Sequence, residues 1–488
     1  MGGVSASPSY TRTVSIDNYP PSPTITNTTK QGGIISIYYL GAIFGAFLFG
    51  NLADHLGRID SIFFAAMFAL VGGALQVAAR NAGWIMGARV VTGMGTGGLM
   101  AVVPVYIAEV SSANHRGGFL GYVFIANYLG ISLAYWLNFG LAYIDDGKSE
   151  FGWRFLLAFQ CLPAFLLLVG VRLLPDSPRY YASMGKYEQA REVLEHIRGG
   201  KGVEIGHEFK EICSVALETK SSSPIRFIEI LVGRATEAPH LGRRAWLCLW
   251  LQIMASWTGI TAVTAYSPVL LRQAGYSSVK QNGLAGGLNT ISIVGTIISA
   301  QIVDRFGRRK CLTWGSFGLF LVNTIAASLF EAARNDSFDV TSIAPAAVLM
   351  LFLFNLCYAA TWGTVAFLIP TEIFPSAMRA QGNGFGITGW AIGVGWTTLV
   401  NPIMFENLEN RIYFLFAGLN LLWIPIVFMF YPETASRSLE SIDAMFLASS
   451  PFYSVMEAAY QTAGNSDGLA TQENTLGDGS KIDEFSQL

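Results

Sequence analysis

Asp54-His55-Leu56-Gly57-Arg58 and Asp304-Arg305-Phe306-Gly307-Arg308-Arg309 are similar charged stretches that lie about half the chain apart. Each stretch separates two long apolar runs, so each reads as a short turn between two helices. A glycine in each stretch permits a tight turn, including a positive φ. The repetition indicates a duplicated unit.

Two further motif pairs recur at similar offsets. Glu109 and Glu372 are each followed by an arginine at the same spacing, Arg116 and Arg379. A proline-rich acidic motif at 175–179 also recurs in shorter form at 432–434. Three motifs at similar offsets predict two related halves, an architecture typical of transporters whose site lies between the halves.

Composition indicates a membrane protein. The chain is 52% hydrophobic and 13% charged, with a mean hydropathy of +0.43, whereas a soluble chain carries about 25% charge. A bilayer core needs about 20 apolar residues per helix, and the runs are too long for barrel strands. Eleven spans are predicted, at 34–53, 60–79, 84–108, 118–140, 152–174, 245–271, 283–303, 311–331, 345–370, 382–402 and 411–431.

Basic residues set the expected orientation. If the spans alternate, the charged motifs and the segment 175–242 fall on one side, and their excess of Lys and Arg predicts that this side is cytoplasmic. The net charge of −2 says nothing about partners. The five cysteines have neither paired nor metal-like spacing, and the histidines show none either, so we expect no disulfide, metal or cofactor.

The chain divides into five predicted regions. Residues 34–174 and 243–431 form two helical bundles, joined by a cytoplasmic linker at 175–242. Within the linker, residues 186–197 have helical spacing of apolar residues, which predicts an amphipathic helix. The ends, 1–33 and 432–488, are read as an extracellular loop with a remnant of a first helix and as a cytoplasmic tail.

The ordered set of motifs resembles the sugar porter family of the major facilitator superfamily. Besides the stretches above, the resemblance rests on Arg89-x-x-x-Gly93-x-Gly95, Pro104-x-Tyr106-x-x-Glu109 and Pro370-Thr371-Glu372-Ile373-Phe374-Pro375. It covers nearly the whole chain and is most similar to fungal members. It implies an all-α major facilitator fold of twelve helices in two six-helix bundles. Residues 1–8 look like the end of the family's first helix, so the chain is expected to be truncated within it.

The resemblance implies a cytoplasmic charge network that closes the outward-open state. Ile59 stands where a second arginine is usual, which predicts a weaker latch in the first half. Arg89 lies inside an apolar span and should have an acidic partner, because a bare cation there costs at least about 2.5 kcal/mol. The resemblance implies that this partner is the aspartate of the family's Gly-Tyr-Asp motif in helix one, which would lie just upstream of Met1. The alternative is that the Arg89 side chain extends to the outer surface. The predicted gating and charge residues are Asp54, Arg58, Arg89, Glu109, Arg116, Asp304, Arg308, Glu372 and Arg379.

The expected substrate cavity departs from the family pattern. Every amide contact typical of hexose porters that can be placed here is altered, which leaves an aromatic and hydroxyl-rich set with few charges. For each residue, helix packing is at least as plausible as substrate contact. The predicted substrate-binding residues are Tyr135, Ser256, Thr258, Thr261, Tyr266, Asn289, Ser292, Trp362, Phe367 and Trp390.

The sequence therefore predicts a secondary transporter of a small solute, a sugar or a related polyol or cyclic acid, with protons as a candidate coupling ion. No nucleophile, phosphate loop or zinc motif suggests an enzyme, and nothing suggests nucleic-acid binding. The expected partners are the solute and the lipid bilayer of the plasma membrane, and a monomer is the family default. The alternatives are a non-transporting nutrient sensor on the same fold and an inactive truncated gene model.

Overall fold

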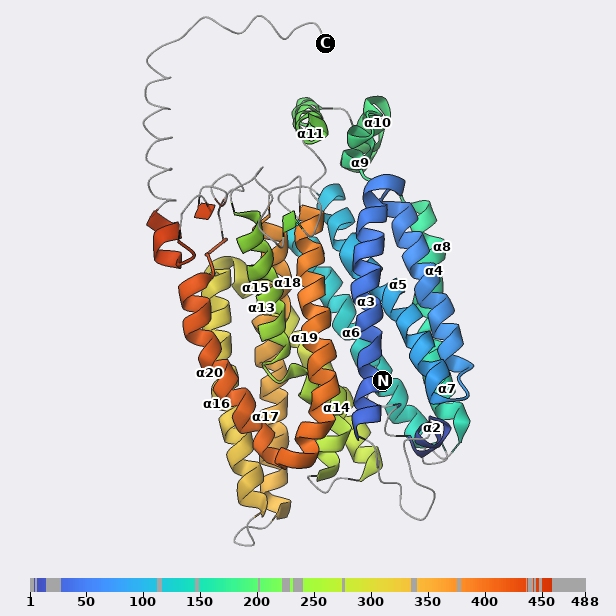
Figure 1. Ribbon diagram of the computed structural model, residues 1–488, viewed down its shortest axis with the longest axis vertical. Coiled ribbons are helices and arrows are strands. Elements are labelled where there is room, and N and C mark those ends of the chain that lie inside the picture. The colour runs from blue at the N-terminus through green and yellow to red at the C-terminus, as the bar shows by residue number, and fades with distance from the viewer. Residues whose placement is uncertain are drawn as a thin grey trace, which may run out of the picture.

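The structure is a computed structural model that describes residues 4, 7–14, 28–111, 116–144, 149–200, 202–221, 229–230, 240–273, 277–334, 340–374, 379–435, 437, 442, 445–446 and 450–458. Within this part of the chain, all regular elements are helices (Figure 1). The prediction of an all-helical protein is confirmed.

The N-terminal bundle contains the helices from α3 to η2. Its α7 and α8 follow one another almost without a break and together form one rod through the bundle. The bounds are Thr28–Leu56 for α3, Arg58–Val77 for α4, Ala82–Val110 for α5, Arg116–Ala142 for α6, Glu150–Phe159 for α7, Cys161–Gly170 for α8 and Val171–Leu173 for η2.

The C-terminal bundle contains the helices from α13 to α20. The bounds are Leu241–Ser256 for α13, Ile260–Gln273 for α14, Ser278–Phe306 for α15, Arg308–Arg334 for α16, Val340–Ala360 for α17, Trp362–Glu372 for α18, Arg379–Leu408 for α19, Glu409–Arg411 for η4 and Ile412–Phe430 for α20. Gly57 and Gly307, the glycines of the repeated stretches, have φ of 101° and 89° and make the matching turns α3–α4 and α15–α16.

Nine segments of the described chain are long and apolar enough to cross a membrane. The predicted spans 245–271 and 382–402 are not among them. The first is divided into α13 and α14, of 16 and 14 residues, by a turn at Gly259 with φ of 108°. The second lies in α19, which carries buried polar residues such as Asn383 and Asn401. The count of eleven spans stays a prediction.

Glycines allow a close contact between α3 and α5 in the N-terminal bundle. A Cβ on Gly41 or Gly45 of α3 would overlap the backbone carbonyl of Val90 or Met94 of α5. From the other side, a Cβ on Gly97 would overlap the carbonyl of Ala42. These small residues allow the two backbones to touch, as is common between membrane helices.

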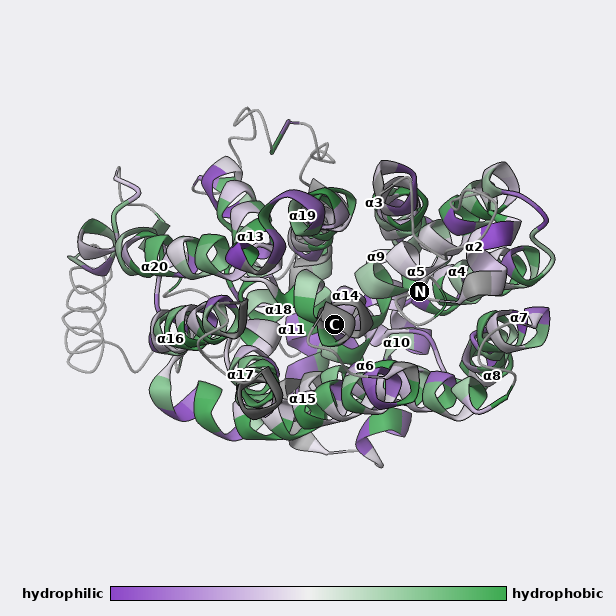
Figure 2. Ribbon diagram, turned by 90° about the horizontal axis from the view of Figure 1, so that it is seen from below, coloured by the Kyte–Doolittle hydropathy of each residue, from purple (hydrophilic) through white to green (hydrophobic). Residues whose placement is uncertain are grey.

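The two bundles meet along two helix pairs. Helix α3 packs along α19, and α6 packs along α15, as seen along the bundle axis in Figure 2. Each pair joins one helix of each bundle. We call the surface between the bundles, formed mainly by these pairs, the seam.

Three helices of the connecting segment lie beyond one end of the bundles, which we call the linker face (Figure 1). They are α9 at Pro178–Ser183, α10 at Tyr187–Arg198 and α11 at Val203–Ser221. The predicted amphipathic helix is confirmed as α10, whose Ala190 and Leu194 are buried against α9 and α11. Arg198 donates a 2.9 Å hydrogen bond to the carbonyl of Val110, which attaches the linker to the N-terminal bundle.

A short helix, α2, spans Pro8–Thr13 within the segment expected to be a loop. Proline at its first position suits a helix start, because that residue's missing N–H would be unpaired there anyway. Tyr10 is buried with Val14 against Ile85 and Trp153 of the N-terminal bundle. Residues 15–27 of the expected loop lie outside the described residues.

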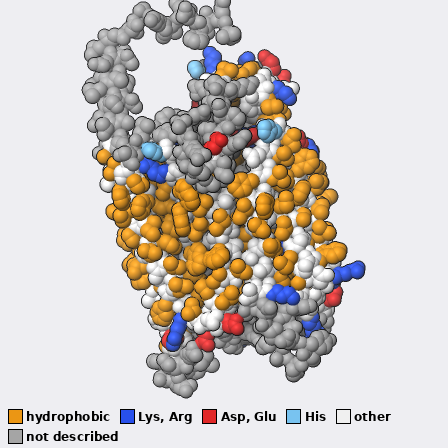
Figure 3. All heavy atoms as spheres, viewed as in Figure 1, with side chains coloured by type: hydrophobic (Ala, Val, Ile, Leu, Met, Phe, Trp, Pro, Cys, Tyr) orange, Lys and Arg blue, Asp and Glu red, His pale blue; other side chains and the backbone are white. Residues whose placement is uncertain are grey.

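The outer surface fits a membrane environment. Figure 3 shows apolar side chains covering the middle of the visible face, with charged side chains gathered at its two ends. Many large side chains on this surface are apolar and exposed, including Phe44, Leu166 and Trp314. The protein is an integral, multi-pass membrane protein.

Candidate functional site

A charge cluster ties together three helices at the linker face of the N-terminal bundle. Arg58, the first residue of α4, donates from Nε and Nη2 to the two carboxylate oxygens of Glu109 on α5, both at 3.0 Å. Its Nη1 donates to the carbonyl of Ala53 on α3 at 2.9 Å, and Asp54 lies 3.5 Å away. This paired geometry is the strong form of an arginine–carboxylate contact.

The C-terminal bundle repeats the cluster. Arg308 donates from Nε and Nη2 to Glu372 at 3.2 and 2.8 Å, and from Nη1 to the carbonyl of Val303 at 3.3 Å. Asp304 lies 2.9 Å from Arg308, and Thr434 donates to Glu372 at 2.6 Å. The duplicated motifs thus build the same contacts in both bundles.

A carboxylate just beyond each bundle, in the segment that follows it, accepts hydrogen bonds from the start of a helix. Asp176 accepts from the backbone N–H groups of Arg58 at 3.1 Å and Ile59 at 3.4 Å. Glu433 accepts from those of Arg308 at 2.8 Å and Arg309 at 3.2 Å. A carboxylate at this position satisfies free N–H groups and complements the helix dipole. The sequence motifs contained both residues, but their pattern gave no sign of this role.

None of these contacts joins one bundle to the other. Glu109 and Glu372, expected to act with Arg116 and Arg379, pair instead with Arg58 and Arg308. The side chains of Arg116 and Arg379 lie outside the described residues. The predicted role of the whole set as a latch that closes one state stays a prediction.

Ile59 of α4 stands at the position that Arg309 occupies in α16. Its counterpart Arg309 lies over the ring of Phe428 on α20, with its Cζ 4.2 Å from the centroid. In the N-terminal bundle, Arg172 of η2 instead reaches α4, where it pairs with Asp60 at 2.5 Å and lies 3.9 Å over Phe63. In the C-terminal bundle the arginine belongs to α16 and reaches α20, whereas in the N-terminal bundle it belongs to η2 and reaches α4. The weaker latch predicted from Ile59 stays a prediction.

Arg89 of α5 is buried, with 5% of its surface exposed. It donates from Nη2 to the carbonyl of Ile35 at 2.7 Å, and its Cζ lies 5.3 Å from the ring centroid of Tyr38. No carboxylate among the described residues pairs with it, and its Nε has no hydrogen-bond partner. The sequence analysis expected the acidic partner to lie upstream of Met1, and that expectation stays a prediction.

Three of the predicted substrate residues lie on the seam. Tyr135 of α6 donates from its hydroxyl to the carbonyl of Thr264 on α14. Phe367 of α18 contacts Phe124 of α6, with ring centroids 5.4 Å apart. Trp390 of α19 meets Tyr39 of α3 edge to face at 5.3 Å. Each of these side chains touches the opposite bundle.

Other predicted residues surround the break between α13 and α14. Ser256 and Thr258 are buried and donate to the carbonyls of Gln252 and Ala255, at 2.8 and 2.7 Å. Thr261 accepts a 3.2 Å hydrogen bond from Thr397, and Tyr266 donates to the carbonyl of Thr398 at 3.0 Å. Because irregular backbone at membrane depth is tolerated where it is buried or lines a cavity, this break fits a site in a transporter.

The remaining three residues are buried in the C-terminal bundle. Trp362 is fully buried and donates to Ser316 of α16 at 3.0 Å. Ser292 donates to the carbonyl of Leu288 at 3.5 Å. Asn289 donates to the carbonyl of Ala285 at 2.8 Å, while its Oδ1 is buried without a hydrogen-bond partner. That free acceptor is the feature of this group best suited to a ligand.

The sequence interpretation missed several polar contacts across the seam. Asn138 of α6 donates to Asn282 of α15 at 3.0 Å, nearer the end opposite the linker face. Asn383 of α19 donates to the carbonyls of Met100 and Ala101 on α5, at 3.3 and 3.2 Å. The one signal in the sequence that could have identified these positions is the presence of asparagines inside otherwise apolar runs.

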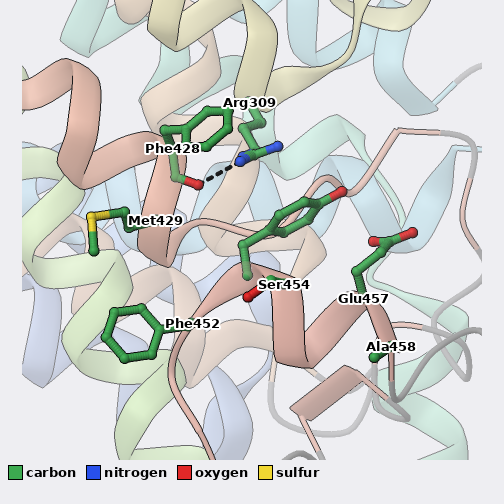
Figure 4. Close-up of a pocket in the computed structure, with 8 residues that line it drawn as sticks. Arg309, Phe428, Met429, Phe452, Ser454, Glu457 and Ala458 are labelled. Carbon is green, nitrogen blue, oxygen red and sulfur yellow. Dashed lines mark hydrogen bonds between the residues drawn. The ribbon is translucent and has the colours of Figure 1, made fainter.

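A pocket of about 560 Å³ lies away from the seam, beside α16 and α20 (Figure 4). Arg309 projects into it between the rings of Phe428 and Tyr453, with its Cζ 3.7 Å from the Tyr453 centroid. Its other lining residues include Glu457 of the C-terminal segment. None of the predicted substrate residues lines this pocket.

Comparison with known sequences places these features in a family. The model of the family described as "Sugar (and other) transporter" matches residues 1–446. The glucose transporter GlcP of Staphylococcus epidermidis is 31% identical over 86% of this chain and 89% of its own length. The MFS-type transporter criB of Aspergillus cristatus is 30% identical, covering 85% and 84%. A quinate permease of Neurospora africana is 28% identical, covering 91% and 84%.

Solved structures show the same fold. A structure of the proton:xylose symporter XylE bound to 6-bromo-6-deoxy-D-glucose superposes with a TM-score of 0.75 at 22% identity, over 91% of this chain and 96% of that one. An inward-open structure of XylE from E. coli gives a TM-score of 0.69 at 24% identity, over 91% and 96%. The predicted major facilitator fold is confirmed, and the chain belongs to the sugar transporter family, a family of membrane transporters rather than enzymes.

Proposed function

We propose that this protein moves a small polyhydroxylated ring compound across a membrane by alternating access. The proposal depends on a difference between the contacts inside each bundle and the contacts that join the bundles at the seam. Each bundle is tied internally by its own buried arginine cluster, such as Arg58 with Glu109. The seam is held by separate hydrogen bonds and ring contacts such as Tyr39 with Trp390. Two rigid bodies with a polar, aromatic interface suit rocking about a central site.

The substrate class is drawn from the seam and from the relatives. Rings on the seam, including Trp390 and Phe367, suit stacking against a sugar or cyclic acid. Relatives include proteins named as a glucose transporter and as quinate permeases. We keep the predicted cavity set as candidate contacts: Tyr135, Ser256, Thr258, Thr261, Tyr266, Asn289, Ser292, Trp362, Phe367 and Trp390.

The setting is part of the proposal. The linker face is cytoplasmic, because Lys and Arg concentrate there and would be retained on that side. The membrane is the plasma membrane, the working unit is a monomer in contact with lipid, and protons drive uptake. The five bounded regions of the chain, 1–33, 34–174, 175–242, 243–431 and 432–488, remain the proposed domains.

Transport in reconstituted vesicles tests the proposal. The purified full chain is placed in proteoliposomes, and uptake of D-glucose, D-xylose, myo-inositol and quinate is measured with and without an inward proton gradient. We expect saturable uptake of at least one solute that a protonophore abolishes. Empty liposomes give the background.

A sensor would behave differently. Binding of a panel solute without any uptake, together with a solute-dependent transcriptional response in cells, would replace transport with sensing. Uptake at the same rate with and without the proton gradient would overturn the proposal of proton coupling but not the proposal of transport.

A further inference from the structure

The pocket beside α16 and α20 lies where two membrane-spanning helices end. Arg309 is the second residue of α16, and Phe428 and Met429 are among the last residues of α20. Both helices are long and apolar enough to cross a membrane, and these ends lie at the linker face (Figure 1). The pocket is therefore at the level where the hydrocarbon of a bilayer meets its headgroups.

The guanidinium of Arg309 is held inside this pocket by two rings. Its Cζ lies 4.2 Å from the ring centroid of Phe428 and 3.7 Å from that of Tyr453 (Figure 4). Its Nη2 also donates a hydrogen bond to the carbonyl of Phe428. Stacking on aromatic faces fixes the planar group, so the pocket presents a cation in a defined orientation.

The charges around the pocket leave it positive. Two carboxylates act electrostatically on Arg309, those of Glu433 and Glu457. Glu433 accepts hydrogen bonds from backbone N–H groups at the start of α16, and Glu457 pairs with Arg437 at 2.9 Å. The exposed Lys310, the next residue of α16, adds a further positive charge. An anionic ligand complements this arrangement.

Much of the pocket wall is apolar and faces outward. Phe428, Met429 and Phe452 line the pocket, and each is a large apolar side chain exposed at the surface. A small hydrophilic anion would leave these side chains uncovered, whereas a hydrocarbon chain would cover them. A cation beside exposed apolar surface at the membrane boundary suits a molecule that carries both a phosphate and acyl chains.

We propose that this pocket binds the headgroup of an anionic phospholipid from the leaflet at the linker face. The phosphate lies on Arg309, and an acyl chain covers Phe428 and Phe452. The site goes beyond the proposed transport function, because it is separate from the seam and involves no solute. Since Tyr453 belongs to the segment that follows α20, a bound lipid holds that segment against the end of the C-terminal bundle.

Lipid binding by the purified full chain tests the proposal. Native mass spectrometry of the delipidated protein in detergent gives its affinity for phosphatidylglycerol and for phosphatidylcholine with the same acyl chains. We expect phosphatidylglycerol to bind at least about tenfold more tightly, since hydrogen bonds to charged groups contribute on that scale. Glycerol phosphate, which has no acyl chains, should not displace the bound phosphatidylglycerol at equal concentration.

Three variants locate the binding. Arg309→Met should reduce the preference for phosphatidylglycerol to less than about twofold. Tyr453→Leu, which lies outside the spans, should also reduce it, and this variant serves if Arg309→Met fails to fold. The matched control is Arg172→Met, because Arg172 also lies over a ring at the linker face, 3.9 Å from the Phe63 centroid, but is paired with Asp60. It should leave the preference unchanged.

Three results would overturn the inference. The first is equal affinity for the two lipids, or a preference that neither Arg309→Met nor Tyr453→Leu changes. The second is displacement by glycerol phosphate at equal concentration, which would assign the pocket to a free phosphate. The third is a preference that emerges only in a variant ending at Ala458, which would show that residues 459–488 of the chain itself fill the pocket. None of these results affects the proposed transport function.

Discussion

Arg308 holds Glu372 through two parallel hydrogen bonds, from Nε at 3.2 Å and from Nη2 at 2.8 Å. The pair links the start of α16 to the end of α18, and Arg58 with Glu109 makes the same link in the other bundle. Each pair therefore fixes helix ends within its own bundle. Among the described residues, neither arginine–glutamate pair reaches the opposite bundle.

This arrangement predicts strong coupling within a bundle and none between bundles. In a double-mutant cycle on thermal unfolding in detergent, Arg308→Met and Glu372→Gln should show a coupling free energy of about 1.5–3 kcal/mol. Arg308→Met with Glu109→Gln should be additive within about 0.5 kcal/mol. Comparable coupling in the second cycle would mean that the clusters interact across the seam.

Asp176 should stabilise the start of α4 as an N-terminal cap. It accepts hydrogen bonds from two backbone N–H groups of that helix, so Asp176→Ala should lower the free energy of unfolding by about 0.5–2 kcal/mol. Asp176→Asn keeps one acceptor oxygen and should lose less. The control is Asp60→Ala, which breaks an exposed pair with Arg172 and should cost less than about 1 kcal/mol. Equal losses for both alanine variants would argue against the cap.

Those features of the fold that follow from repeated motifs or from the spacing of apolar residues could be predicted from the sequence. Motif duplication indicated two bundles, and the apolar stripe of 186–197 indicated α10. The role of Asp176 was not predictable, because its partners lie more than a hundred positions away and meet it only once α4 and the linker pack together. The division of α13 from α14 was also missed, since the apolar run continues through Gly259, whose positive φ leaves no trace in hydropathy.

The candidate site was predictable only in part. Tyr135, Phe367 and Trp390 were singled out, and the structure places each against the opposite bundle. Tyr38 and Tyr39 escaped notice because tyrosines in a glycine-rich span are as typical of packing as of binding. What distinguishes these two tyrosines from packing residues is that they lie on the face of α3 next to Arg89, which only the folded structure shows.

Gly45 should be irreplaceable by alanine. A Cβ there would overlap the carbonyl oxygen of Met94, a backbone atom that cannot rotate away, so α3 and α5 would have to separate. We expect Gly45→Ala to lower the melting temperature sharply or to abolish folded protein on size-exclusion chromatography. On the same helix, a Cβ on Gly50 meets nothing within 4 Å, so Gly50→Ala should be neutral or stabilise by up to about 1 kcal/mol. Similar behaviour of the two variants would contradict the close α3–α5 contact.

Cys213 offers a test of the topology through its chemistry. It lies on α11 at the linker face and is partly exposed, whereas Cys248 is fully buried. With a membrane-impermeant maleimide, Cys213 should be labelled in inside-out vesicles and not in intact cells, and Cys213→Ser should remove that signal. Labelling from outside intact cells would place the linker face on the wrong side and overturn the orientation.

The pH dependence of that labelling reports the environment of Cys213. Burial raises the pKa of the Cys213 thiol above its ordinary value, and the thiolate is the reacting form. A raised pKa means that less of the thiol is present as thiolate at any pH below that pKa, so labelling of Cys213 at pH 7 should be slower than labelling of free cysteine. The labelling rate of free cysteine begins to level off at about pH 8.5, whereas the rate for Cys213 should still rise about tenfold per pH unit there. A rate curve that matches free cysteine would show that α11 does not pack against α9 and α10 as the structure has it.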